Sequence, residues 1–190
     1  MGPIVVRTER LVLREWTVED AHDFMSLATD PEVMRYINDG IAYHQEDVLE
    51  FIDRMTTTQS ERGWSRWALQ LREPTDGEPG GVIGLCGPGC TFAPDVEVGW
   101  WVHRQLWGRG LATEAGRAAV EYCFGTIGFP RLICCVHPEN MRSLSVARKI
   151  GFAPHDEIEH KGVRLIRHQL LNPLTEPPRD PRFVRDCTGI

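Results

Sequence analysis

A glycine-rich turn between an apolar strand and a helix is the stretch of this sequence best suited to binding a ligand. The strand is expected over 96–102, the turn over 105–110 and the helix over 111–124. Gly108 and Gly110 free the backbone to curl, so that several N–H groups can point at one spot. The first four N–H groups of the helix also lack partners within it. Together with the positive end of the helix dipole, these donors predict a site for an anion, most simply a phosphate or pyrophosphate.

Glu97 is a charged residue inside the apolar strand that leads into this turn. Such a charge is costly unless it is paired, protonated or facing a cavity. Facing a cavity would make Glu97 a candidate general base, whereas an ion pair with a nearby arginine would make its role structural. The sequence favours the cavity and leaves the ion pair open.

Asn140 and Ser143 lie at the start of a second helix, which is expected over 140–150. Asn is among the preferred N-cap residues, and Ser143 falls at the third helical position. Both residues could therefore have only a local structural role. Gly151 takes the position at which helices usually stop.

Four blocks of the sequence, in the right order, resemble the GNAT superfamily of N-acetyltransferases. The motif Gln105-x-x-Gly108-x-Gly110 resembles the pyrophosphate loop of that family, and residues 97–101 resemble its central strand. Residues 137–152 resemble its last core helix. The opening block, residues 8–14, is typical of the branch that acetylates the N-termini of ribosomal proteins. The resemblance spans about residues 8–170.

The resemblance implies an enzyme that binds acetyl-coenzyme A and lets a bound primary amine attack the thioester directly, without a metal or a covalent enzyme intermediate. Glu97 would accept the proton of the amine, directly or through water, and Ser143 would protonate the departing thiolate. The commonest family pattern has a tyrosine where this chain has Ala147. The cofactor contacts implied by the family are Val102, Gln105, Trp107, Gly108, Arg109, Gly110, Leu111, Ala112 and Asn140.

The acceptor is not identified by these motifs. The opening block favours the α-amine of a protein or peptide, and a small amine such as a polyamine, an amino acid or an antibiotic is the alternative. An α-amine has a pKa of about 8 and a lysine amine one of about 10.4, so most acceptor amines are protonated at pH 7 and need a base. A third possibility, kept open by Ala147, is a protein that binds acyl-coenzyme A as a sensor without turnover.

The elements that must position these residues alternate between helices and strands, which predicts one α/β domain over 1–171 with a mixed central sheet of about six or seven strands flanked by helices. A doubly wound dinucleotide-binding sheet is disfavoured because Thr113 stands where its third glycine would be. The remaining stretch, 172–190, is rich in proline and is expected to be an extended tail, either loose or laid on the partner of a homodimer. Strands are expected at 11–13, 67–71, 82–85, 96–102, 132–136, 153–159 and 163–170, and helices at 17–28, 31–37, 45–57, 111–124 and 140–150.

Composition excludes several classes of protein. The 190 residues include 21 Lys and Arg and 27 Asp and Glu, a net charge of -6 that argues against a nucleic-acid-binding surface. No apolar run approaches the roughly 20 residues that span a bilayer, and the N-terminus lacks the apolar core of a signal peptide. The six cysteines have neither zinc-binding nor redox spacing. We therefore expect a cytoplasmic protein with reduced thiols.

Overall fold

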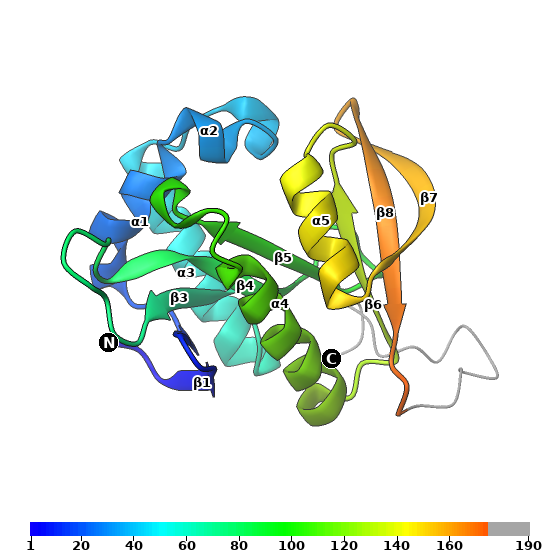
Figure 1. Cartoon of the computed structure of the whole chain (residues 1–190), viewed down its shortest axis with the longest axis horizontal. Coiled ribbons are helices and arrows are strands. Elements are labelled where there is room, and N and C mark those ends of the chain that lie inside the picture. Colours follow the sequence, from blue (N-terminus) through cyan, green and yellow to red (C-terminus); the bar gives the residue numbers. More distant parts are fainter. Residues whose placement is uncertain (175–190) are drawn as a thin grey trace.

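An eight-stranded mixed sheet runs through residues 1–174, the part of the chain that the computed structural model describes (Figure 1). All neighbouring strands are antiparallel except β5 and β6, which are parallel. The order across the sheet is β1 (Ile4–Arg7), β2 (Leu11–Arg14), β3 (Trp67–Leu71), β4 (Val82–Gly89), β5 (Glu97–Val102), β6 (Arg131–Val136), β8 (Val163–Leu171) and β7 (Ala153–His160).

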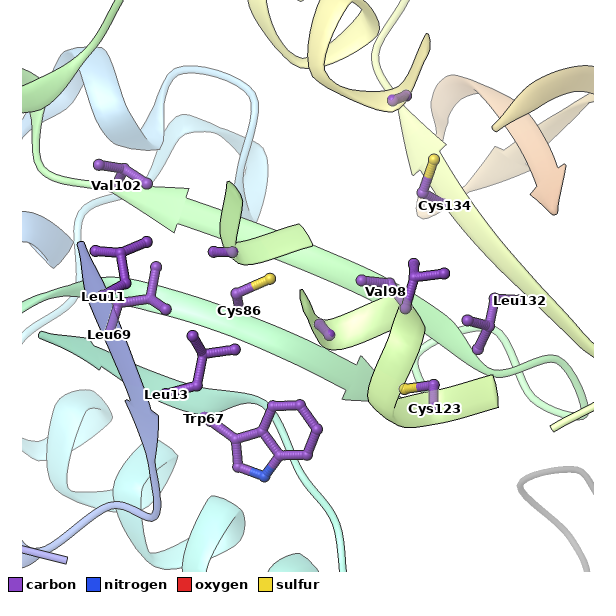
Figure 2. Close-up of a cluster of buried hydrophobic side chains, with 14 of the residues drawn as sticks. Leu11, Leu13, Trp67, Leu69, Cys86, Val98, Val102, Cys123, Leu132 and Cys134 are labelled. Carbon is purple, nitrogen blue, oxygen red and sulfur yellow. The ribbon is translucent and has the colours of Figure 1, made fainter. Parts of the chain in front are cut away.

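Helices cover both faces of this sheet and enclose two apolar cores. On one face, α1 (Ala21–Ala28) and α3 (Gln45–Arg62) pack their Phe24 and Phe51 side chains against Leu85 of β4. On the other face, α4 (Leu111–Tyr122) packs against β2 to β5, and α5 (Met141–Ile150) lies beside it. Figure 2 shows side chains from these strands, Trp67 and Val98 among them, gathered on the α4 face. The short helix α2 (Pro31–Met34) follows α1.

The parallel strands β5 and β6 are paired over only a short stretch. Glu97 is paired with Ile133, and the Ile133 N–H donates to the carbonyl of Val96 at 3.0 Å. Beyond this point β5 and β6 diverge, so that the carboxyl halves of the two strands face a gap rather than each other (Figure 1). Because α4 follows β5 and α5 follows β6, both helices begin beside this gap.

The predicted α/β fold is confirmed, with differences at several elements. The sequence missed β1, a short edge strand whose alternation is interrupted by a bulge between Ile4 and Val6, so the sheet has one strand more than the upper estimate. Strand β4 continues through Pro88 to Gly89, four residues beyond its predicted end at 85. Proline is tolerated there because the pairing of β4 with β3 has already ended at Cys86.

Helix α3 is five residues longer than the predicted end at 57 and tolerates the threonines of its last turns. The Thr58 hydroxyl donates to the carbonyl of Arg54 at 2.7 Å, and the helix stops only at Gly63. Helix α2 is shorter than expected and ends at Met34. The predicted tail, 172–190, lies outside the described residues except for its first three.

The buried cysteines are packing residues. Burial raises the pKa of the Cys86 thiol to about 12 and raises the pKa of Cys123 as well. Cys86, Cys123, Cys134 and Cys135 are free thiols. Cys90 is disulfide-bonded, so the expectation of uniformly reduced thiols is wrong at this residue. A disulfide's connectivity leaves no spacing signal that the sequence could have shown.

Within residues 1–174, none of the helices combines the length and the apolar character needed to cross a bilayer.

Candidate active site

A cleft of about 660 Å³ lies between the carboxyl end of β5, α2 and the first turns of α5. Trp100, Trp101 and Val102 of β5 line it from the sheet. Glu32 and Tyr36, in and just after α2, line the opposite wall from α5, which contributes Ser143 and Val146. The loop before α4 closes one end with Gly108, Gly110 and the first residues of the helix.

The loop before α4 has the backbone shape that the sequence predicted. Gly108 and Gly110 both have φ +80°, a backbone conformation that residues other than glycine rarely adopt. Gly110 is the N-cap of α4 and has no side chain to accept hydrogen bonds from the first turn. The first N–H groups of α4 therefore point toward the cleft end without a side-chain cap, which suits a pyrophosphate group.

Contacts on both sides hold this loop in place. The indole N–H of Trp107 donates to the carbonyl of Val102 at 2.7 Å, and the Arg142 guanidinium lies 4.6 Å from the Trp107 ring centroid. On the outer side, Arg10 donates to the carbonyl of Arg109 at 2.9 Å. The loop is thus fixed to β5, to α5 and to the N-terminal block before any ligand binds.

The outer contact is completed by Glu114 in the first turn of α4. Its carboxylate pairs with Arg10 at 2.6 Å and accepts the Thr8 hydroxyl at 2.6 Å. Burial alone would raise the pKa of Glu114, but the hydrogen bonds from Thr8 and Arg10 outweigh it and the pKa is lowered. The opening block, residues 8–14, is therefore tied to the start of α4.

Asn140 and Ser143 are brought to the same cleft by α5. The Asn140 side chain accepts the Ser143 backbone N–H at 3.1 Å, so the N-cap suggested by the sequence is present. Both residues also line the cleft, which leaves the Ser143 hydroxyl and the Asn140 amide group beside it. Ala147 is fully buried and faces the core, so the α5 position that carries tyrosine in the commonest family pattern supplies no hydroxyl here.

Glu97 is held by an ion pair, the structural alternative that the sequence left open. Arg66 donates to its carboxylate through Nη2, and the same nitrogen donates to the Thr91 hydroxyl at 3.0 Å. The guanidinium lies across Gly89 and Gly99, where a Cβ would be 2.9 Å and 3.2 Å from the Arg66 Nε. Nε itself is buried and has no hydrogen-bond partner. The Glu97 side chain is on the face of the sheet covered by α1 and α3, outside the cleft lining.

The structure therefore gathers most, though not all, of the residues expected from the sequence. Gln105, Arg109 and Glu97 are absent from the cleft lining, and Arg109 instead forms an ion pair with Glu78. The residues that do line the cleft together are Val102, Trp107, Gly108, Gly110, Leu111, Ala112, Asn140 and Ser143.

Sequence reasoning missed a ring contact beside the cleft. Tyr36, just after α2, lines the cleft and stacks on His137, just after β6, with ring centroids 4.9 Å apart. The sequence carried no signal for this contact because 100 residues separate the two rings. Within residues 1–174, no three His, Cys, Asp or Glu side chains come together as metal ligands would.

Comparisons with known proteins agree with this geometry. Residues 10–153 match the family model described as "Acetyltransferase (GNAT) domain". The chain is 29% identical over 147 residues to the uncharacterized N-acetyltransferase p20 of Bacillus licheniformis, covering 76% of this chain and 80% of that protein. It is 28% identical over 159 residues to the spermidine N(1)-acetyltransferase of Escherichia coli (strain K12), covering 78% of this chain and 76% of that protein.

The fold is also found among solved structures. A putative ribosomal-protein-serine acetyltransferase from Vibrio cholerae superimposes with a TM-score of 0.69 at 18% identity, covering 90% of this chain and 99% of that chain. Because the family model covers most of the chain, this protein belongs to the GNAT family of acetyltransferases and is an N-acetyltransferase that uses acetyl-coenzyme A.

Proposed function

We propose that this enzyme acetylates the α-amino group of a protein or peptide. The observation that carries the proposal is the size of the cleft, about 660 Å³, which is ordinary for one small ligand. The same cleft has to hold the reactive arm of the cofactor. Only the amine of the acceptor and its nearest atoms then have room inside, and a peptide N-terminus presents its amine in this way while the rest of the chain stays outside.

Bound acetyl-coenzyme A supplies the thioester that the amine attacks. The N–H groups at the start of α4, next to Gly108 and Gly110, are proposed to hold its pyrophosphate, and Trp107 keeps that loop attached to β5. The Asn140 side chain is proposed to position the cofactor arm from α5. Since its oxygen is already used as the N-cap of Ser143, its amide NH₂ group is what remains for that role.

Two residues are proposed to handle protons. Ser143 lines the cleft and is proposed to donate a proton to the departing thiolate. Glu97 is proposed to take the proton of the amine through water rather than by direct contact, because its carboxylate is paired with Arg66 and lies outside the cleft lining. What supports Glu97 is its place on β5, the strand from which Trp100 and Trp101 reach the cleft.

A small cationic amine is the second candidate acceptor. The cleft is lined by Glu32 and Glu139, and neither carboxylate has an ion-pair partner among residues 1–174. Such carboxylates on both walls would suit an acceptor with more than one ammonium group. The similarity to a spermidine acetyltransferase points the same way.

One mixed-acceptor assay separates these candidates. The protein is incubated with isotope-labelled acetyl-coenzyme A and a mixture of three acceptor types: peptides with a free α-amine, N-terminally blocked peptides with one lysine, and polyamines. Mass spectrometry then identifies the products. Label on the α-amine of free peptides, with little on polyamines, is expected. Label mainly on polyamines would reject the α-amine proposal in favour of the second candidate.

A further inference from the structure

Tyr36 lines the cleft, and its ring is held against His137, which lies outside the lining. Their rings are nearly parallel, with an interplanar angle of 29° and centroids 4.9 Å apart. Tyr36 follows α2, whereas His137 follows β6 and precedes α5. We call this pair the clasp. It joins the part of the molecule packed on α1 and α3 to the part built from β6 and α5.

Local hydrogen bonds fix the His137 side of the clasp. Its Nδ1 accepts the backbone N–H of Glu139 at 3.2 Å, and its carbonyl accepts the N–H of Asn140 at 2.9 Å. The ring orientation is therefore set by the same turn that starts α5. Moving the His137 ring would disturb the turn that carries the Asn140 cap.

The Tyr36 side is anchored through α2. Val33 and Met34 of that helix are buried, and Asp30 at its N-cap forms an ion pair with Arg104 at 3.1 Å. Arg104 belongs to the turn just before the cofactor loop. Helix α2 is thus attached to the cofactor-loop side at its start and to the β6–α5 side at Tyr36. The distance between the walls is set by contacts that exist without an acceptor.

We propose that the clasp is a specificity-determining pair that admits an amine carried on a small group and disfavours one carried on a bulky group. This inference rests on the proposed function, because it takes the cleft as the acceptor site. A cleft shared with the cofactor arm leaves little room beside the amine, and because Tyr36 lines that cleft, a bulky substituent has to push the Tyr36 ring away from His137 to enter. Separating a stacked aromatic pair is expected to cost such an acceptor about fivefold to tenfold in kcat/KM.

The test compares two peptides that differ only in the first residue. Tripeptide amides beginning with alanine and with leucine are assayed with the full chain and acetyl-coenzyme A, and the ratio of their kcat/KM values is measured. The parent should prefer the alanine peptide. Tyr36→Ala should lower that preference about fivefold to tenfold, and His137→Ala should lower it to a similar extent.

Two control variants separate the clasp from general effects of losing a ring. Tyr36→Phe keeps the stack and should keep the parent ratio. Tyr122→Ala removes a different aromatic contact, that with Trp67 at 5.3 Å, from a residue outside the cleft lining. It should lower stability without changing the ratio. A ratio that changes equally in Tyr122→Ala and Tyr36→Ala would overturn the proposal.

A second acceptor series makes the outcome independent of the α-amine proposal. n-Pentylamine and neopentylamine carry the same primary amine on an unbranched and a bulky group. Peptides that stay unlabelled while these amines react would reject the α-amine proposal, and the clasp would then be judged on the alkylamine ratio. Ratios that are unchanged by Tyr36→Ala in both series would reject the clasp and leave the α-amine proposal standing.

Discussion

Replacing Gly110 by aspartate tests whether the start of α4 binds the cofactor. Gly110 has φ +80° and ψ 3°, and the nearest atom to an added Cβ would be Nη2 of Arg10 at 3.6 Å. The substitution therefore meets no close neighbouring atom, and its strain is confined to the backbone. It does place a carboxylate at the N-cap, where it can accept the N–H groups proposed to hold the pyrophosphate and repel a phosphate by its charge.

The expected magnitudes follow from the backbone and from binding linkage. A residue other than glycine in the left-handed region costs about 1–2 kcal/mol, with aspartate near the lower end. Acetyl-coenzyme A at about 100 times its Kd should stabilise the parent by about 2.7 kcal/mol. For a chain of this length, that corresponds to a rise in Tm of about 5–10 °C. Gly110→Asp should lower the Tm of the free protein slightly and abolish most of the ligand-induced rise.

Gly63 provides a matched control for backbone strain. It has φ 76° and ψ 6° at the end of α3, and nothing lies within 4 Å of an added Cβ. Gly63→Asp should therefore lower the Tm of the free protein by a similar amount and keep the full rise on adding acetyl-coenzyme A. Thermal unfolding of the three proteins with and without cofactor gives the comparison. A full cofactor-induced rise in Gly110→Asp would refute pyrophosphate binding at the start of α4.

Further predictions concern the proton-handling and structural residues. Glu97→Gln should lower turnover near pH 7, and the turnover should recover as pH rises. Lower stability with unchanged turnover would leave Glu97 only its structural role in the ion pair. Ser143→Ala should lower the maximal rate about tenfold to a hundredfold at constant cofactor Kd, and an unchanged rate would remove the proposed role of Ser143. Asn140→Ala should instead raise the cofactor Kd and cost about 1 kcal/mol of stability. Burial would raise the pKa of Asp20, but hydrogen bonds from Arg14 outweigh burial and the pKa is lowered. The ionised Asp20 therefore stabilises the fold above the unfolded pKa of about 3.9, and this stabilisation is lost as pH falls through the folded pKa. Asp20→Asn should therefore destabilise by about 3 kcal/mol at pH 7 and converge with the parent in acid, as unfolding by denaturant at several pH values would show.

The parts of the site that the sequence predicted are those that depend on local chemistry. The positive φ at Gly110 and the Asn140 cap follow from residue type and from position relative to one helix. The start of α5 and the loop before α4 were therefore placed correctly before their surroundings were known. The sheet itself was predictable because most strands alternate or form continuous apolar runs, whereas β1 was hidden by its bulge.

The parts that could not be predicted depend on contacts between distant residues. Arg66 precedes Glu97 by 31 residues, and their ion pair exists because Gly89 and Gly99 leave room for a guanidinium across the β4–β5 face. The two glycines lie ten residues apart in the sequence, and nothing in their positions indicated that both would lie beside Arg66. The clasp was hidden for the same reason, since its rings meet only after α2 has packed on α1.

The location of the cleft follows from the one parallel pair in an otherwise antiparallel sheet. Six of the eight strands pair with their neighbours only in the antiparallel sense, whereas β5 and β6 run parallel to each other. A parallel pair needs a crossover, here α4, and places the carboxyl ends of both strands at the same edge of the sheet. The helices that follow, α4 and α5, therefore both begin at that edge, with their positive ends beside the gap. An antiparallel pair would have put those two starts at opposite edges, so the parallel pair is what brings Gly110 and Asn140 to one cleft.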